Sequence, residues 1–291
     1  MQRKKTTKNI NFAAEKVLVF GGVYSNFQAL QKMREIADEL HIAPQNIIST
    51  GDIIGYCAQP EETMNFFTKW GIHSIAGNVE IQLREGEEEC GCDFTEGSRC
   101  DMFSRRWYPF AQEKLSAANI RRMHDLPDFL TFTFAEKRFA VVHGSYFETS
   151  EFIFKSSPWS VKERNFAALG CDVVLAGHAG LPFSDNKDGK IWLNAGVIGM
   201  PANDGTPRVW YMILEKTAAG VFTFSHRSFV YDHETAARLM EENKLPREYA
   251  HTLRTGLWDN CEILPERETA TQGISLHLAE NEKPVEKMPT L

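Results

Sequence analysis

The sequence predicts an α/β protein organised around a parallel sheet. Between residues 17 and 76, short apolar runs typical of buried strands alternate with segments in which apolar residues recur at helical spacing. This alternation indicates strands joined by crossover helices. Glycine and polar residues follow the strands directly, as at Gly21-Gly22 and Gly51-Asp52. Because ligands of such sheets gather at the carboxyl ends of the strands, a functional site is expected at these turns.

Three strands and two helices are expected in this first part of the chain. The first helix has apolar residues from Phe27 to Leu40 on one face, and Ser25 or Asn26 can cap its N-terminus. The second helix begins at Pro60, whose fixed φ suits a first helical turn. The strands are expected at residues 17–20, 46–50 and 72–76, and the helices at residues 25–40 and 60–70.

Residues 81–110 interrupt this pattern with acidic residues, glycines and three cysteines, followed by an aromatic run. We expect them to form a Cys-containing cap or loop insertion over the strand ends. Beyond this insertion, residues 129–134 and 138–142 have the pattern of a hairpin. Further strands are expected at residues 173–176, 191–194, 208–214 and 221–229, and further helices at residues 116–126, 159–169, 234–243 and 247–253.

The two ends of the chain differ in composition from its middle. Residues 1–15 start with a basic run and contain few large apolar residues, so we expect a flexible N-terminal arm. Residues 259–291 are acidic, contain three prolines and lack sustained periodicity, so we expect a disordered tail. The folded domain is therefore expected to span residues 16–258.

Charge and hydropathy exclude several classes of protein. The 291 residues carry a net charge of -7 and the pI is near 5.8, which argues against a broad nucleic-acid-binding face. No apolar run suits a secretory signal or approaches the about 18 residues of a membrane span. We therefore expect a cytoplasmic protein that binds neither membranes nor nucleic acid and whose six cysteines are reduced thiols.

Four polar residues, each with a glycine beside it, follow the predicted strands. They are Asp52, Asn78, His143 and His178. Each has an ordinary structural explanation when taken singly, since an aspartate can cap a turn and a buried histidine usually has a partner in the core. Together they offer a carboxylate, an amide oxygen and two imidazoles, which suit Mn, Fe or Zn better than Ca. The four residues therefore predict one common metal site.

These segments resemble the calcineurin-like metallophosphoesterase superfamily, in particular its small prokaryotic phosphodiesterase branch. The matching motifs are Gly51-Asp52-Ile53-Ile54-Gly55, Gly77-Asn78-Val79-Glu80, His143-Gly144 and Gly177-His178-Ala179-Gly180. Residues 181–183, 194–201 and 230–232 resemble further parts of the branch, so the resemblance covers roughly residues 16–258. It implies a four-layer α/β/β/α sandwich, with two central sheets flanked by helices.

The resemblance also implies two metals side by side, and this chain has lost the ligands of one of them. The positions that would bind the first metal are Gly22, Tyr24, Asp52 and Gly180, of which only the shared Asp52 keeps its ligand. The positions of the second metal are Asp52, Asn78, His143 and His178, all present. We therefore expect one divalent transition metal (Mn, Fe or Zn) in a mononuclear centre.

Two further positions bear on catalysis. Val79 stands where the family has a histidine that assists the leaving group or the phosphate, and valine cannot transfer a proton. Tyr24 could bind ferric iron as a phenolate, pack into the vacated space, or donate a hydrogen bond to a substrate. With a metal-bound hydroxide as the nucleophile, no side chain is assigned as a certain catalytic group.

The cysteines of the insertion are not explained by the resemblance. Cys90, Cys92 and Cys100 lie just after the second motif, and Cys57 follows the first one. They could bind zinc or an iron–sulfur cluster as a second site, remain free thiols, or form a redox pair such as Cys92 with Cys100.

Three functions follow from these observations. The first is a metal-dependent hydrolase of phosphomonoesters or phosphodiesters, with a small phosphorylated substrate such as a nucleotide, slow on alkyl esters. The second is an inactive or weakly active relative that binds a metal or nucleotide as a sensor or scaffold. The third is a thiol-based metal or redox protein that uses the segment from Cys90 to Cys100.

Overall fold

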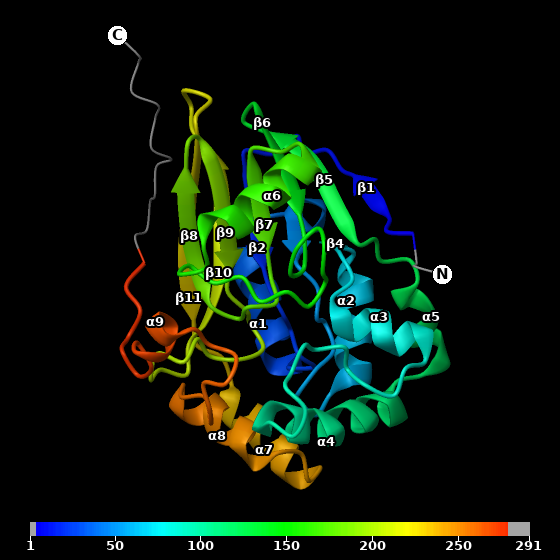
Figure 1. Ribbon diagram of the computed structural model, residues 1–291. Helices are drawn as coiled ribbons and strands as arrows, with labels where there is room; N and C mark the ends of the chain where they lie inside the picture. The colour runs from blue at the N-terminus through cyan, green and yellow to red at the C-terminus, as the bar shows by residue number, and fades with distance from the viewer. Residues whose placement is uncertain (1–3, 279–291) are drawn as a thin grey trace.

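Two β-sheets pack face to face, and helices cover their outer faces (Figure 1). The computed structural model describes residues 4–278. The four-layer α/β/β/α arrangement expected from the sequence is confirmed.

The first sheet has six strands and mixes parallel and antiparallel pairs. The neighbours β6, β7 and β9 are parallel, whereas β5 pairs with β6, and β8 with β9, in antiparallel register. The expected hairpin at β5 and β6 is confirmed. In spatial order the strands are β1 (Thr7–Asn9), β5 (Phe129–Phe134), β6 (Lys137–Val141), β7 (Val173–Ala176), β9 (Lys190–Ala195) and β8 (Pro182–Lys187).

The second sheet has five strands. The three expected parallel strands lie side by side, and a C-terminal hairpin extends the sheet through an antiparallel pair of β10 with β2. In spatial order the strands are β11 (Phe222–Phe229), β10 (Val209–Lys216), β2 (Lys16–Phe20), β3 (Ile47–Ser49) and β4 (His73–Ser74).

Strand β2 shows how the sequence builds the layers. Successive side chains of a strand point to opposite faces. Val17 and Val19 face the other sheet, where they join the core between the sheets, and Leu18 and Phe20 face the helices. Because both faces of the strand are buried, its sequence is continuously apolar.

The outer layers are formed by helices of both halves of the chain. Helix α6 packs on the first sheet, and α1, α2, α4, α7 and α8 contribute to the core on the outer face of the second. The expected cap of the first helix is Asn26, whose side chain accepts from the Ala29 N–H. The helices are α1 (Phe27–Glu39), α2 (Pro60–Trp70), α3 (Asn78–Glu85), α4 (Arg99–Lys114), α5 (Ala117–Met123), α6 (Trp159–Leu169), α7 (His233–Glu242), α8 (Arg247–Thr255) and α9 (Glu266–Thr269), with a 3-10 turn at Pro44–Asn46.

The inserted segment is largely helical. Residues 81–110 contain the end of α3, a loop with Cys90 and Cys92, and the first part of α4. The aromatic run lies in α4, which Ser98 caps through the Asp101 N–H, and Trp107 and Tyr108 are buried. The segment is therefore a helical cap joined to the core.

The N-terminal arm is not free where the structure describes it, which corrects the expectation for residues 4–15. Strand β1 pairs with β5 in parallel, and the Thr6 N–H donates to the Asp128 carboxylate at 2.6 Å. Ile10 is 4% exposed and lies in the core between the sheets. The basic composition suggested a solvated arm, but an edge strand is stabilised through its backbone, which composition does not report.

The disordered tail is likewise corrected for residues 259–278. This segment contains α9, and the Glu262 carboxylate accepts from the Arg99 and Cys100 N–H groups at the start of α4. Asp259 pairs with the Arg99 guanidinium at 2.5 Å. The segment is held by specific polar contacts, which need no periodic apolar pattern. The rest of the expected tail, residues 279–291, lies outside the described residues.

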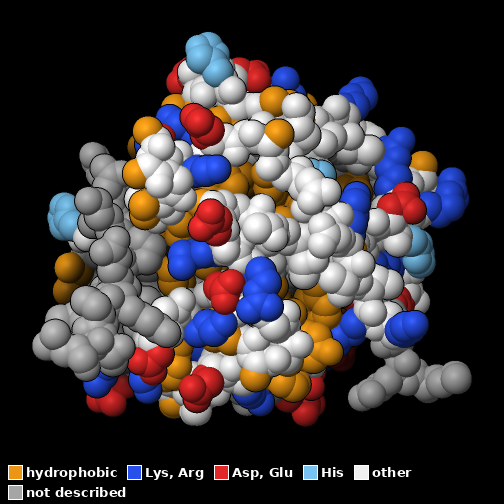
Figure 2. Space-filling model, turned by 90° about the horizontal axis from the view of Figure 1, so that it is seen from above, with side chains coloured by type: hydrophobic (Ala, Val, Ile, Leu, Met, Phe, Trp, Pro, Cys, Tyr) orange, Lys and Arg blue, Asp and Glu red, His pale blue; other side chains and the backbone are white. Residues whose placement is uncertain are grey.

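The surface carries charges of both signs. Figure 2 shows Lys and Arg side chains mixed with Asp and Glu over one face. No helix among residues 4–278 is long and apolar enough to cross a membrane.

Replacing Ile10 by alanine is expected to lower the free energy of unfolding by about 2–5 kcal/mol, because a buried side chain is truncated in the core between the sheets. Lys8→Ala removes an exposed side chain of the same segment and should change the free energy of unfolding by less than about 0.5 kcal/mol. Urea denaturation measures both. Equal stability of the two variants would show that the arm is not part of the fold.

Candidate metal centre

The four predicted ligand residues lie where neighbouring strands end. Asp52 follows β3, Asn78 begins α3 after β4, His143 follows β6 and His178 follows β7. Asp52 and His178 have φ angles of 57° and 56°. This left-handed conformation costs a residue with a Cβ about 1–2 kcal/mol. Strain of this size persists where surrounding contacts hold it, and such positions cluster at functional sites.

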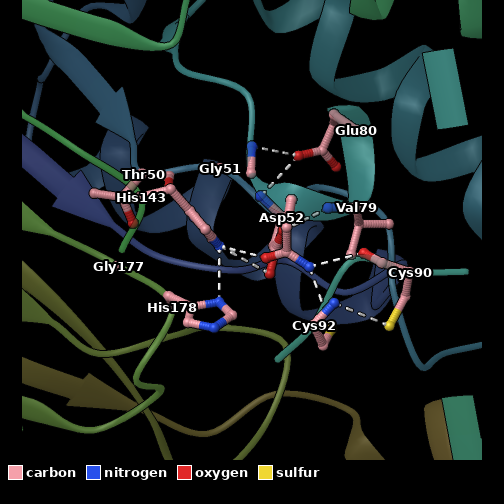
Figure 3. A network of polar contacts seen from close by, with 12 residues as sticks. Thr50, Gly51, Asp52, Val79, Glu80, Cys90, Cys92, His143, Gly177 and His178 are labelled. Atoms are coloured by element: carbon pink, nitrogen blue, oxygen red, sulfur yellow. Dashed lines mark hydrogen bonds and ion pairs between the residues drawn. The ribbon is translucent and has the colours of Figure 1, made fainter. Parts of the chain in front are cut away.

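The structure brings the ligand atoms of these residues together. Nε2 of His143 lies 3.1 Å from Oδ1 of Asn78, 3.1 Å from Nδ1 of His178 and 3.2 Å from Oδ2 of Asp52. Figure 3 shows Asp52, His143 and His178 pointing toward one another. All four side chains are buried. Among residues 4–278, Asp52, His143 and His178 are the group of His, Cys, Asp and Glu side chains with ligand atoms within 4.8 Å of one another.

The convergent atoms fit a cation. Nδ1 of His143 lies 2.7 Å from the Thr50 carbonyl oxygen, which can only accept, so Nδ1 donates. Nε2 of the neutral ring then presents a lone pair to the other three ligand atoms. A proton on Nε2 would satisfy one neighbour at a time, whereas a metal ion satisfies all of them. Orientation of a ligand histidine by a backbone carbonyl is also the usual arrangement at metal sites.

The two histidines differ electrostatically. Burial and the neighbouring His143 lower the pKa of His178 to about 3, so its ring is neutral near pH 7, as a metal ligand must be. Burial also lowers the pKa of His143, but the Asp52 carboxylate, the Thr50 carbonyl and Glu80 together outweigh this effect and the net direction is upward. Asp52 and a proton on His143 therefore attract each other, and a metal cation would replace that proton.

Glu80 holds the backbone of the site. Its carboxylate accepts from the N–H groups of Asp52, Ile54 and Gly77 at 2.9–3.0 Å. Figure 3 shows the Glu80 carboxylate turned toward the backbone of Asp52. It thereby ties the loop after β3 to the start of α3. Burial and the Asp52 carboxylate raise the pKa of Glu80 to about 7, against the opposing effect of the N–H donors.

Gly77 makes this close approach of the two loops feasible. A Cβ at Gly77 would lie 2.0 Å from Oδ1 of Asp52 and 2.5 Å from its backbone nitrogen. Glycine at this position is therefore required for the contact of the loops that carry Asp52 and Asn78.

A side chain occupies the space beside Gly22, where the family resemblance would place a ligand of a first metal. A Cβ on Gly22 would lie 2.4 Å from Cε1 and Cζ of Tyr24, so the tyrosine ring occupies the space into which an aspartate would project. Tyr24 is buried and its ring packs edge-on against Tyr56, with 4.7 Å between centroids. Burial holds the pKa of Tyr24 well above its usual range, so the phenol stays protonated. Of the roles considered for Tyr24, packing into the vacated space fits this geometry.

The two other positions that differ from the family pattern, Gly180 and Val79, are also packed against side chains or the core. A Cβ at Gly180 would contact the ring of Trp258 at 3.4 Å. Val79 is buried in the same apolar core cluster as Tyr24, and its backbone nitrogen lies 3.4 Å from Oδ1 of Asp52. Valine therefore fills core space and provides no proton at the position where the family has histidine.

The cysteines of the cap do not gather into a metal site of their own within the described residues. All six cysteines of the chain are free thiols. Cys90 and Cys92 lie beside the ligand Asn78, whose Nδ2 donates to the Cys90 carbonyl at 2.9 Å and to the Cys92 sulfur at 3.2 Å. Cys57 is buried in the core, and Cys100 contacts Asn260 in the C-terminal segment.

Two functional contacts were not found from the sequence. Thr50 contributes only a backbone carbonyl, which no motif reports. Glu80 is different, because its place in the second motif predicts that it orients Asn78 or a neighbouring loop, and it holds the loop of Asp52. Trp258 ends the expected domain, and the sequence predicted no role for it. The one available signal was a tryptophan directly before the change in composition at residue 259.

Glu80→Gln is expected to lower the free energy of unfolding by about 2 kcal/mol or more at pH 8, because an amide offers one acceptor oxygen and turns an NH2 group toward backbone donors. The measurement belongs at pH 8 because the wild-type carboxyl, with a pKa of about 7, is mainly ionised there. The matched control is Glu88→Gln, which alters an exposed carboxylate in the loop after α3 and should leave stability unchanged. Equal stability of both variants would show that Glu80 does not hold the two loops.

Comparisons with known proteins agree with this geometry. A family model described as the calcineurin-like phosphoesterase superfamily domain matches residues 16–218. An uncharacterized protein of Methanocaldococcus jannaschii is 22% identical over 247 residues, which are 79% of this chain and 93% of that protein.

Solved structures show the same fold. A hypothetical protein of Pyrococcus horikoshii has a TM-score of 0.70 at 19% identity, over 84% of this chain and 99% of that one. A metallophosphoesterase of Sphaerobacter thermophilus has a TM-score of 0.66 at 22% identity, over 84% of this chain and 100% of that one. Since the family model spans most of the chain, this protein belongs to the calcineurin-like phosphoesterase superfamily.

Proposed function

We propose that this protein is a phosphoesterase that depends on one divalent transition metal. The observation that carries the proposal is the convergence of Asn78, Asp52 and His178 on Nε2 of His143 in a superfamily that uses divalent metals for hydrolysis. The oxygen and imidazole donors suit Mn, Fe or Zn. A metal bound there would lower the pKa of a coordinated water and polarise a phosphoryl oxygen.

The residues of the chain set the limits of this activity. Tyr24 fills the space in front of Gly22, so only one set of ligands remains to hold a metal that neutralises the phosphate. Val79 supplies no proton to the leaving group, and such help is typically worth about 10²–10⁴ in rate. The enzyme should therefore hydrolyse esters of acidic alcohols, which leave without protonation, far faster than alkyl esters.

A metal-binding protein without turnover is the second candidate. It is favoured by the same two replacements, Tyr24 and Val79, which remove a metal position and a proton donor while leaving the four remaining ligands together. The third candidate, a thiol-based protein, is supported only by the proximity of Cys90 and Cys92 to Asn78.

Protein purified without chelators is expected to contain about one metal ion per chain and to release phosphate from 2,2,2-trifluoroethyl phosphate, the ester of a small acidic alcohol, with Mn²⁺ added. Asp52→Ala and His143→Ala should lose both metal and activity, because each removes a ligand. The matched control His124→Ala changes an exposed histidine and should keep both. Elemental analysis and absorbance assays provide the measurements. One bound metal without turnover would favour the second candidate.

Cys92→Ala is expected to weaken metal affinity by no more than about tenfold, because Asn78 keeps its hydrogen bond to the Cys90 carbonyl. Cys100→Ser should leave the affinity unchanged. Titration calorimetry with Mn²⁺ measures both. Loss of the metal in Cys90→Ser or Cys100→Ser, together with its retention in His178→Ala, would instead support a thiol site.

A further inference from the structure

A small cavity opens directly on the candidate metal centre. Its volume is about 80 Å³, and Asp52 and His178 lie in its wall. The remaining wall comes from distant parts of the chain, including the cap, helix α8 and the C-terminal segment of residues 258–263. The cap and the C-terminal segment therefore determine the space available to a substrate that binds the metal.

Several aromatic side chains line the cavity. Phe152 lies against the ring of His178 with 4.2 Å between centroids, and Tyr56 lies against Tyr249 at 4.7 Å. Trp258 covers Gly180 and is anchored by a hydrogen bond from its Nε1 to the Pro201 carbonyl at 2.8 Å. These rings hold one another in place, so the cavity is shaped before a ligand enters.

The cavity offers little to neutralise a negative charge. Among the described residues that line it there is no lysine or arginine, and Asp52 and Asp259 add negative charge. Arg99 contacts the wall through Asp259, but its guanidinium is already paired with Asp259 at 2.5 Å and faces Glu248 at 3.8 Å. One phosphate can be balanced by a metal cation, whereas further phosphates would enter without counter-charges, which costs several kcal/mol each.

The size of the cavity limits the organic part of the ligand. A cavity of roughly 150 Å³ is known to hold one benzene molecule, so about 80 Å³ cannot enclose a nucleoside. We propose that the cavity takes a singly phosphorylated ester whose enclosed organic group is small, apolar and uncharged, and that it excludes nucleotides.

This inference rests on the proposed function and narrows its substrate class. Hydrolysis of such an ester forms a new P–O bond to water and breaks the ester P–O bond. One proton of the water leaves with the small alcohol, and the other stays on the phosphate. A nucleotide, which the sequence analysis named as a possible substrate, is thereby excluded by the volume of its nucleoside, and a nucleoside di- or triphosphate is excluded by its charge as well.

Binding to the Mn²⁺-loaded protein tests the inference separately from turnover. Methylphosphonate carries a phosphoryl group with a small apolar substituent and is not hydrolysed, whereas AMP carries a similar phosphoryl group on a nucleoside. We expect methylphosphonate to bind at least about tenfold more tightly than AMP, and AMP more tightly than ATP. Equal or tighter binding of AMP, or no binding of methylphosphonate, would overturn the inference. Failure of the proposed function would appear separately, as this binding order without release of phosphate from 2,2,2-trifluoroethyl phosphate, an ester of an acidic alcohol that is smaller than a benzene ring.

Enlarging the cavity should change this order. Trp258→Ala removes the ring over Gly180 and is expected to reduce the preference for methylphosphonate over AMP by about tenfold, while Trp159→Ala, in the distant helix α6, should leave it unchanged. Tyr249→Leu opens the wall from helix α8 and provides a second variant if Trp258→Ala does not fold. An unchanged preference in a folded Trp258→Ala or Tyr249→Leu variant would contradict the assigned cavity.

Discussion

The candidate centre depends on one buried carboxylate that fixes two backbones. Glu80 accepts three N–H groups from the loop of Asp52 and from the start of α3, and Gly77 allows these segments to touch. Asp52 is held in a left-handed conformation that its own preferences disfavour. Without this clamp the loop could relax, and the carboxylate would lose its place beside His143. A rigid position for each ligand atom is what a metal site needs, because its affinity depends on precise geometry.

The replacements on the other side of the centre support one another. Tyr24 occupies the space in front of Gly22, and a larger residue at position 22 would collide with the ring. Neither change is accommodated easily without the other: an aspartate at position 22 needs the ring removed, and the ring needs glycine there. A packed tyrosine ring beside a glycine avoids the cost of burying two ionisable groups at these positions. This side of the centre is therefore an ordinary apolar core.

The sequence revealed the parts of the site that depend on residue type and missed those that depend on backbone or on unpatterned segments. Asp52, Asn78, His143 and His178 were predictable because each follows an apolar strand and keeps its motif glycine. Strand β1 was missed because an edge strand is held through backbone hydrogen bonds, and a basic run conceals them. Residues 259–278 were missed because single polar anchors such as Glu262 leave no period in the sequence.

The C-terminal segment, which the sequence did not predict to be ordered, also covers the candidate centre. Trp258 lies over Gly180, a position where the family pattern has a metal ligand, and Asp259 ties the segment to the start of α4 through Arg99. A centre with the one cation proposed above would have less positive charge to offer than a centre with two, so its enclosure by apolar rings is consistent with a ligand of low charge. The packing of Tyr24 beside Gly22 and the position of Trp258 over Gly180 act in the same direction, because both reduce the volume that the centre can accept.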